Sequence, residues 1–194
     1  ELEKENNNVV VCPPFVYLPY FSQDFNFKLG AQNCFWKKEG SYTGEVSVSM
    51  LKDLDCQYVI VGHSERRKLF GEKGEIIKKK IKICLEEELT PVLCIDNLSQ
   101  IKNVLDEIDE KVIIAYEPLS AIGSGEPVDW KEAKEMNLKI KDLLGANQVV
   151  LYGGSVNSSN VLNFTREAEF DGVLVGGNSL KSEEFIKIIQ KAIH

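Results

Sequence analysis

The sequence predicts one α/β domain in which parallel strands alternate with helices, and it favours a (β/α)8 barrel over an open, doubly wound sheet. Seven short apolar runs are spread along the 194 residues. They are continuously apolar rather than alternating, as in parallel strands that are covered on both faces. Segments with helical spacing lie between most of them. Small or polar residues repeatedly follow the runs, at the strand ends where barrels carry their chemistry.

The seven runs supply the strands. They are, in chain order, Val9–Cys12, Leu29–Gln32, Tyr58–Val61, Pro91–Ile95, Val112–Tyr116, Val149–Tyr152 and Gly172–Val175. No long glycine-rich dinucleotide turn follows the first run, which also favours the barrel. Because such a barrel has eight strands, we expect one strand upstream of Glu1. The seven runs are then strands 2 to 8 of a single domain over residues 1–194.

Three segments have the spacing of amphipathic helices: residues 74–89, 99–108 and 182–193. In the first, four apolar side chains fall on one side of the helix: Ile76, Ile77, Ile81 and Leu85. The lysines at 78–80 are therefore predicted to form a solvated helix face rather than an anion site.

Composition excludes several classes of partner. Aspartate and glutamate number 30 against 23 lysines and arginines, for a net charge of −7. This acidic balance argues against nucleic acid and anionic membranes as partners. No apolar segment approaches the length of a membrane span. The five cysteines are not spaced as metal ligands, so we expect reduced, buried thiols in a cytoplasmic protein.

Two of the seven strand ends carry Gly-Gly followed by small polar residues: "GGS" at 153–155 and "GGNS" at 176–179. Glycines let backbone amides approach an anion, and a following helix start adds positive potential. Because both come from the last two strands, they fit the phosphate site that such barrels commonly build. The alternative is two tight turns that need flexible residues.

Glu117 ends the fifth run, where a carboxylate is costly unless it is solvated, paired or used. The segment "PLSAIGSGEP" (118–127) follows, with small residues and glycines between two prolines. This composition predicts a lid in which Ile122 closes over the carboxylate and strips water from it. The alternative is an ordinary surface loop.

His63 is the one internal histidine of the chain, in "VGHSERR" (61–67). It lies between a strand end and a predicted helix start, a position that favours the uncharged ring. A neutral imidazole can donate a hydrogen bond to a carbonyl oxygen. With a carboxylate base it suits proton abstraction next to a carbonyl. Taken alone, the histidine could equally be a packed polar residue.

The motifs "YVIVGHSERR", "AYEP…AIGSGEP", "LYGGSV" and "GVLVGGNSL", with "VVVCPPF", "GAQNC" and "YTGEVS", resemble the triosephosphate isomerase family from residue 9 onward. The resemblance implies the eight-stranded TIM barrel. It also implies interconversion of dihydroxyacetone phosphate and glyceraldehyde 3-phosphate, in glycolysis and gluconeogenesis, without metal or coenzyme. A neutral histidine, a glutamate base and a closing loop are general to that enzyme.

Carried over by position, the resemblance makes Glu117 the base and His63 the electrophile that polarises the substrate oxygens. Glu65 matches the second glutamate of that catalytic loop. Tyr152 and Ser155 match residues that hold the closed lid. The positions that match substrate-binding residues are Gly123, Ser155, Gly176 and Gly177, for the phosphate, and Ile122 and Leu174, for an apolar clamp.

The loop "GSYTGE" (40–45) resembles the loop that projects into a neighbouring subunit in this family. The resemblance implies a homo-oligomer, at least a dimer, in which Thr43 lies near the partner's active site. Without a partner, Tyr42 would leave an exposed apolar tip.

The chain departs from the family pattern in several places. The Asn-x-Lys segment of the family's first strand is not in this sequence, and we expect the native protein to contain it. Leu119-Ser120 stands where a tryptophan is usual, and "CIDN" (94–97) replaces Cys-Ile-Gly-Glu. A catalytically impaired scaffold or fragment is therefore an alternative. An epimerase or synthase barrel is a third, against which the His63–Glu117 combination argues.

Overall fold

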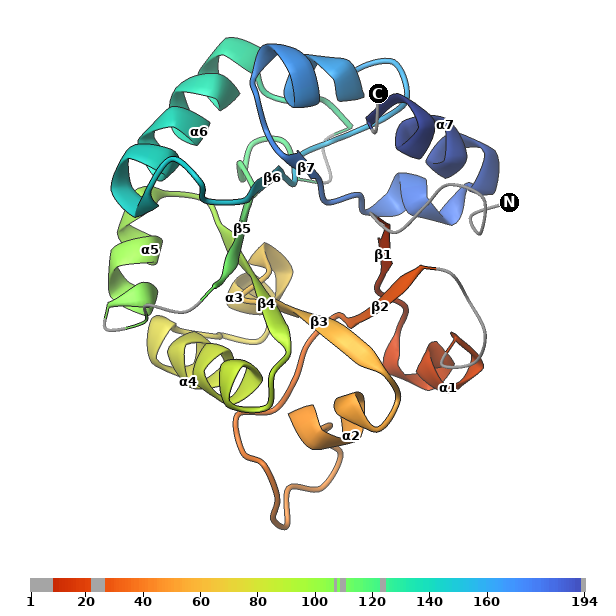
Figure 1. The fold of residues 1–194 in the computed structure, drawn as a ribbon, viewed down its shortest axis with the longest axis vertical. Coiled ribbons are helices and arrows are strands. Elements are labelled where there is room, and N and C mark those ends of the chain that lie inside the picture. The colour runs from red at the N-terminus through yellow and green to blue at the C-terminus, as the bar shows by residue number, and fades with distance from the viewer. Residues whose placement is uncertain (1–8, 22–26, 107, 109–110, 123–124, 193–194) are drawn as a thin grey trace. The chain divides into compact units, whose positions relative to one another are not determined.

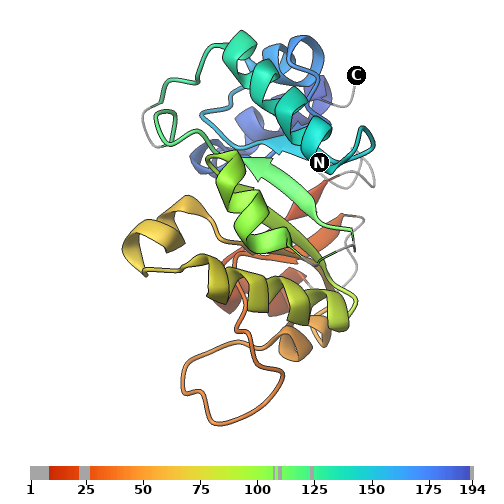
Figure 2. The ribbon, with the colours of Figure 1, turned by 90° about the vertical axis from the view of Figure 1, so that its left-hand side faces the viewer.

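The structure is a computed structural model that describes residues 9–21, 27–106, 108, 111–122 and 125–192. It divides into two compact units, shown in two views in Figures 1 and 2. Unit 1 comprises residues 1–93 and 102–112, and unit 2 comprises residues 94–101 and 113–194. The expectation of a single domain over 1–194 stays a prediction.

Unit 1 contains parallel strands in chain order. They are β1 (Val10–Val11), β2 (Lys28–Ala31), β3 (Cys56–Val61) and β4 (Thr90–Ile95), whose last two residues belong to unit 2. In register, Val10 lies beside Lys28, and Tyr58 lies beside Thr90. Every β4 residue except Thr90 is buried. Such burial is expected for a strand that is covered on both faces, and it explains the continuous apolar run.

The helices of unit 1 follow its strands. They are η2 (Phe15–Tyr17), α1 (Leu18–Phe21), α2 (Val48–Lys52), α3 (Ser64–Leu69) and α4 (Gly74–Glu86). As predicted, α4 buries Ile77 and Ile81 completely. The prediction that the lysine run is solvated was wrong for Lys80, which is only 2% exposed. Lys80 lies three residues after Ile77 and next to Ile81, so helical geometry turns it toward the buried face.

Unit 2 contains the other parallel strands: β5 (Ile113–Tyr116), β6 (Val150–Tyr152) and β7 (Gly172–Val173). Its helices are α6 (Trp130–Leu144), the π-helix η3 (Asn163–Glu167), η4 (Gly177–Leu180) and α7 (Ser182–Ala192). Helix α5 (Leu98–Leu105) begins in unit 2 and ends in unit 1. Tyr152 stacks on Phe164, with ring centroids 3.7 Å apart, and contacts Phe170 at 5.5 Å, so aromatic rings fill much of this core.

The structure confirms all seven predicted strands, with bounds within two residues, and the three predicted amphipathic helices. Each strand pairing recorded among the described residues is parallel. Within the same residues, no helix has the length and apolar character needed to cross a membrane. The five cysteines are thiols rather than disulfides, as expected.

Candidate active site

The predicted catalytic residues fall in both units. His63 and Glu65 follow β3 in unit 1, and Glu117 follows β5 in unit 2. The lid and the two glycine pairs also belong to unit 2. Each unit therefore contributes its own set of side chains, and each set has a geometry that can be read by itself.

His63 is the N-cap residue of α3, with φ −50° and ψ 142°. Its backbone oxygen accepts hydrogen bonds from the amides of Arg66, at 2.9 Å, and Arg67, at 3.1 Å. Its ring nitrogen Nδ1 accepts from the Glu65 amide at 3.3 Å. A ring nitrogen that accepts a hydrogen bond carries no proton, so this contact assigns the proton of the neutral ring to Nε2. In the neutral ring, Nδ1 is thus held by the first turn of α3, and Nε2 carries the proton.

Gly62 makes this turn possible. Its φ of +71° is in the left-handed region, which side chains disfavour. A Cβ there would also lie 2.9 Å from Arg67 Nη2 and 3.0 Å from Ile77 Cδ1. The glycine before His63 is therefore required both by backbone conformation and by packing.

Glu65 lies beside the histidine but is largely in solvent. Its Oε2 is 3.8 Å from His63 Nδ1, and its side chain is 68% exposed. Its firm contact with His63 is through its backbone amide. A catalytic role for the Glu65 carboxylate stays a prediction.

Glu117 is only 2% exposed at the end of β5. Its amide donates to the Ile95 oxygen at 2.7 Å, which continues the parallel pairing beyond the strand. Its side chain runs against Gly153, where a Cβ would lie 2.9 Å from Glu117 Cγ and 3.7 Å from Oε1. Gly153 is thus glycine because the predicted base occupies the space a side chain would need. Sequence reasoning missed this, since it interpreted the Gly-Gly pair as a phosphate motif or a tight turn and considered no steric cause.

The predicted lid segment is hydrogen-bonded to β6 and to the turn that follows β6. Gly123 and its neighbour Ser124 lie outside the described residues. On the N-terminal side, Ser155 Oγ donates to the Ala121 oxygen at 2.7 Å. On the C-terminal side, the Val128 amide donates to the Tyr152 hydroxyl at 3.3 Å. Tyr152 and Ser155 therefore contact the lid segment, as the resemblance implies.

Tyr152 is fully buried, and this burial raises its pKa to about 12. Its hydroxyl keeps its proton at neutral pH and accepts a hydrogen bond from the Val128 amide.

The two residues of the predicted apolar clamp, Ile122 and Leu174, are each half-buried. The Leu174 amide donates to the Tyr152 backbone oxygen at 2.9 Å.

The second glycine pair has open surroundings. Gly176 and Gly177 are exposed, and a Cβ on either would have no atom within 4 Å. Gly176 caps η4, so a helical turn follows this pair at once, as expected. That expectation was wrong for the first pair, after which no helix begins until residue 161. A turn formed by the Asn157 side chain separates this pair from the helix. Asn157 Oδ1 accepts hydrogen bonds from the amides of Ser159 and Asn160.

The described part of the chain contains no cluster of three or more histidine, cysteine or acidic side chains that could hold a metal ion. Unit 1 offers a histidine whose Nδ1 accepts a hydrogen bond, and unit 2 offers a buried carboxylate and two glycine turns. A carboxylate base and a histidine donor are residue types that suit proton transfer next to a carbonyl.

Comparison with known sequences identifies the family. Residues 1–192 match the family described as triosephosphate isomerase. The triosephosphate isomerase of Dictyoglomus turgidum is 41% identical over 98% of this chain and 89% of its own length. That of Aquifex aeolicus is 42% identical over 95% of this chain and 86% of its own length. That of Dehalococcoides mccartyi strain BAV1 is 40% identical over 99% and 86%. The chain belongs to the triosephosphate isomerase family.

Proposed function

We propose that this chain is an isomerase that interconverts dihydroxyacetone phosphate and D-glyceraldehyde 3-phosphate, in glycolysis and gluconeogenesis. Membership of the family supports the reaction. The structural observation that carries the proposal is the geometry of His63, whose Nδ1 accepts the Glu65 amide. In the neutral ring that contact places the proton on Nε2, where it can be donated to a carbonyl oxygen.

In the proposed reaction, the Glu117 carboxylate removes a proton from C1 of the ketose. It returns that proton to C2 of the resulting enediol or enediolate. The 2% exposure of Glu117 supports this role, because a carboxylate stripped of water is a stronger base. His63 donates its Nε2–H to the carbonyl oxygen as negative charge develops there, and it takes the hydroxyl proton of C1 in return as the aldehyde forms. Each step moves a proton, so the reaction needs no redox partner.

The phosphate is proposed to bind the backbone amides of Gly176 and Gly177, together with Gly123 and Ser155. The empty space around the Cβ positions of Gly176 and Gly177 supports this, since a bulky anion needs close access to the amides. Ile122 and Leu174 would cover the reacting carbons and exclude water.

The partner is proposed to be a second copy of the chain, which docks through the loop at 40–45. This loop extends away from the strands of unit 1 in both ribbon views (Figures 1 and 2). Tyr42 is 41% exposed near its tip and packs back on Phe35, with ring centroids 4.5 Å apart. Unit 1 exposes further large apolar side chains that a partner could cover: Val16, Tyr17, Tyr20, Met50, Leu69 and Phe70. We also propose a cytoplasmic location, which the reduced state of the five cysteines supports.

A coupled assay in both directions tests the proposal. We expect the purified protein to isomerise both triose phosphates and E117Q to lose at least about 100-fold in kcat. E135Q, the same change at an exposed position of α6, is the matched control and should retain activity. An inactive, folded wild-type protein would instead favour the impaired scaffold. Equal losses of stability and activity in E117Q would mean that Glu117 serves the fold.

A further inference from the structure

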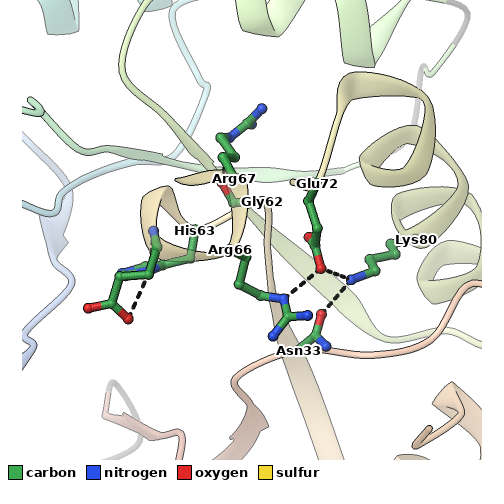
Figure 3. A network of polar contacts seen from close by, with 8 residues as sticks. Asn33, Gly62, His63, Arg66, Arg67, Glu72 and Lys80 are labelled. Atoms are coloured by element: carbon green, nitrogen blue, oxygen red, sulfur yellow. Dashed lines mark hydrogen bonds and ion pairs between the residues drawn. The ribbon is translucent and has the colours of Figure 1, made fainter. Parts of the chain in front are cut away.

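Four polar side chains of unit 1 connect the helix that His63 caps to the rest of that unit (Figure 3). They are Asn33, from the segment after β2, Arg66, from α3, Glu72, from the turn between α3 and α4, and Lys80, from α4. We call them the Lys80 cluster. The reaction proposed above uses none of them.

Helix α3 has little apolar packing to hold it in place. It has six residues and none of them is buried. Leu69, at its end, is 69% exposed, and Phe70, its C-cap, is 67% exposed. A helix this short is also unstable by itself. Polar contacts are therefore important for its position.

Two arginines make those contacts. Arg67 Nε donates to the Gly62 oxygen at 2.6 Å, which holds the residue before His63. Arg66 Nε donates to Glu72 Oε1 at 2.6 Å, and the Glu72 amide donates back to the Arg66 oxygen at 3.2 Å. Glu72 thus contacts both the side chain and the backbone of Arg66. The amide of Arg66 in turn donates to the His63 oxygen.

Lys80 holds Glu72. Its ammonium donates to Glu72 Oε1 at 2.5 Å and to Asn33 Oδ1 at 2.6 Å. The side chains of Lys80 and Glu72 are only 2% and 7% exposed, so their attraction is little screened by water. Arg66 and Lys80 share the single oxygen Oε1, so a displacement of Lys80 changes the position of the acceptor that Arg66 uses.

We propose that Lys80 and Glu72 are positioning residues for His63. Lys80 fixes the Glu72 carboxylate, Glu72 fixes Arg66, and Arg66 fixes the first turn of α3. That turn presents the Glu65 amide to His63 Nδ1 and so maintains the Nε2–H tautomer. The catalytic consequence rests on the proposed isomerase function, whereas the effect on the His63 ring does not.

The first test separates kcat from KM. K80M removes the charge and keeps much of the volume, and K79M makes the same change on an exposed position of the same helix. We expect K80M to lose about tenfold or more in kcat, because small displacements of a catalytic group are costly. We expect KM to stay within about threefold, since no phosphate contact is lost. K80R, which restores a buried cation, should recover part of the loss, and K79M should match wild type.

The second test observes His63 directly. The chain has two histidines, so ¹⁵N-labelled histidine gives two sets of ring signals, and H194A assigns them. We expect wild-type His63 to show one neutral tautomer with its proton on Nε2. In K80M we expect these signals to shift toward a mixture of tautomers, and in K79M we expect no change.

The outcomes separate the two proposals. A folded K80M protein with wild-type kcat and wild-type His63 signals overturns the positioning role. So does a loss of activity that only follows the folded fraction, measured by circular dichroism. Should K80M fail to fold, E72Q, which keeps the shape of the side chain, is read in the same two ways. If the wild-type protein has no isomerase activity, the proposed function fails, and the His63 spectra still decide the positioning role.

Discussion

The two glycine pairs of unit 2 look alike in sequence but have different surroundings. At Gly153 and Gly154 a Cβ would meet Glu117 Cγ at 2.9 Å and the Tyr152 hydroxyl at 2.3 Å. At Gly176 and Gly177 it would meet nothing within 4 Å. The first pair is therefore glycine because large side chains of the site occupy the adjacent space. The second pair leaves its own space open, as a turn that receives a ligand must. One sequence signal thus has two physical causes.

The largest expected effect is on activity in G153A. The added methyl group displaces the Glu117 side chain, and a displaced base reacts slowly, so we expect kcat to fall roughly 100-fold. KM should change much less, and steady-state kinetics separates the two. G74A is the control, because a Cβ at Gly74 comes no closer than 3.8 Å to Val104. Wild-type kcat in G153A would show that Glu117 is not held by this contact.

G154A should mainly affect stability. Its Cβ would overlap the buried Tyr152 ring, and overpacking of this kind costs about 1–3 kcal/mol in the free energy of unfolding. Chemical denaturation of G154A beside G176A measures the difference. Because G176A adds a methyl group to open space, its stability should stay within about 0.5 kcal/mol of wild type. Equal destabilisation of both variants would contradict the distinction between the pairs.

The buried Tyr152 hydroxyl should also make the free energy of unfolding depend on pH in the alkaline range. Its folded pKa of about 12 is above the ordinary value of 10.0, so its contribution to stability is complete below pH 10 and declines as the pH rises toward 12. At pH 11 we expect this group alone to lower the free energy of unfolding by about 1.4 kcal/mol. Y152F cannot ionise, so its stability should fall less between pH 9 and 11. Parallel pH profiles for the two proteins would refute this account.

The smallest effect should be that of G177A. A methyl group beside the amides that are proposed to bind phosphate hinders the anion without disturbing the fold. We expect KM to rise several-fold, which corresponds to about 1 kcal/mol of binding free energy, with little change in stability. Inhibition by inorganic phosphate should weaken to the same degree. An unchanged KM and phosphate affinity would mean that this pair is only a turn.

Much of the architecture could be predicted because its signals are local. Continuous apolar runs marked every described strand, and family membership supports the predicted (β/α)8 barrel class. The expectation of an upstream strand stays a prediction. The prediction for Lys80 failed because charge was weighed above helical position, although its spacing from Ile77 pointed inward.

The candidate site was only partly predictable. His63 and Glu117 could be proposed as candidates because unusual residues at strand ends indicate chemistry, and their catalytic roles stay predictions. The Lys80 cluster could not be, since Asn33, Glu72 and Lys80 are far apart in the chain and individually ordinary. The steric roles of Gly153 and Gly154 were hidden for the same reason, because the atoms they avoid include the side chain of another strand end.

The sequence by itself determined the order of strands and helices, the family and the candidates for moving a proton. These follow from periodicity and from residue types at fixed places along the chain. Only the tertiary structure decided which nitrogen of His63 accepts a hydrogen bond, why two of the four paired glycines admit no side chain, and that a lysine is buried next to the turn after α3. Those features depend on distances between segments that the chain brings together only on folding.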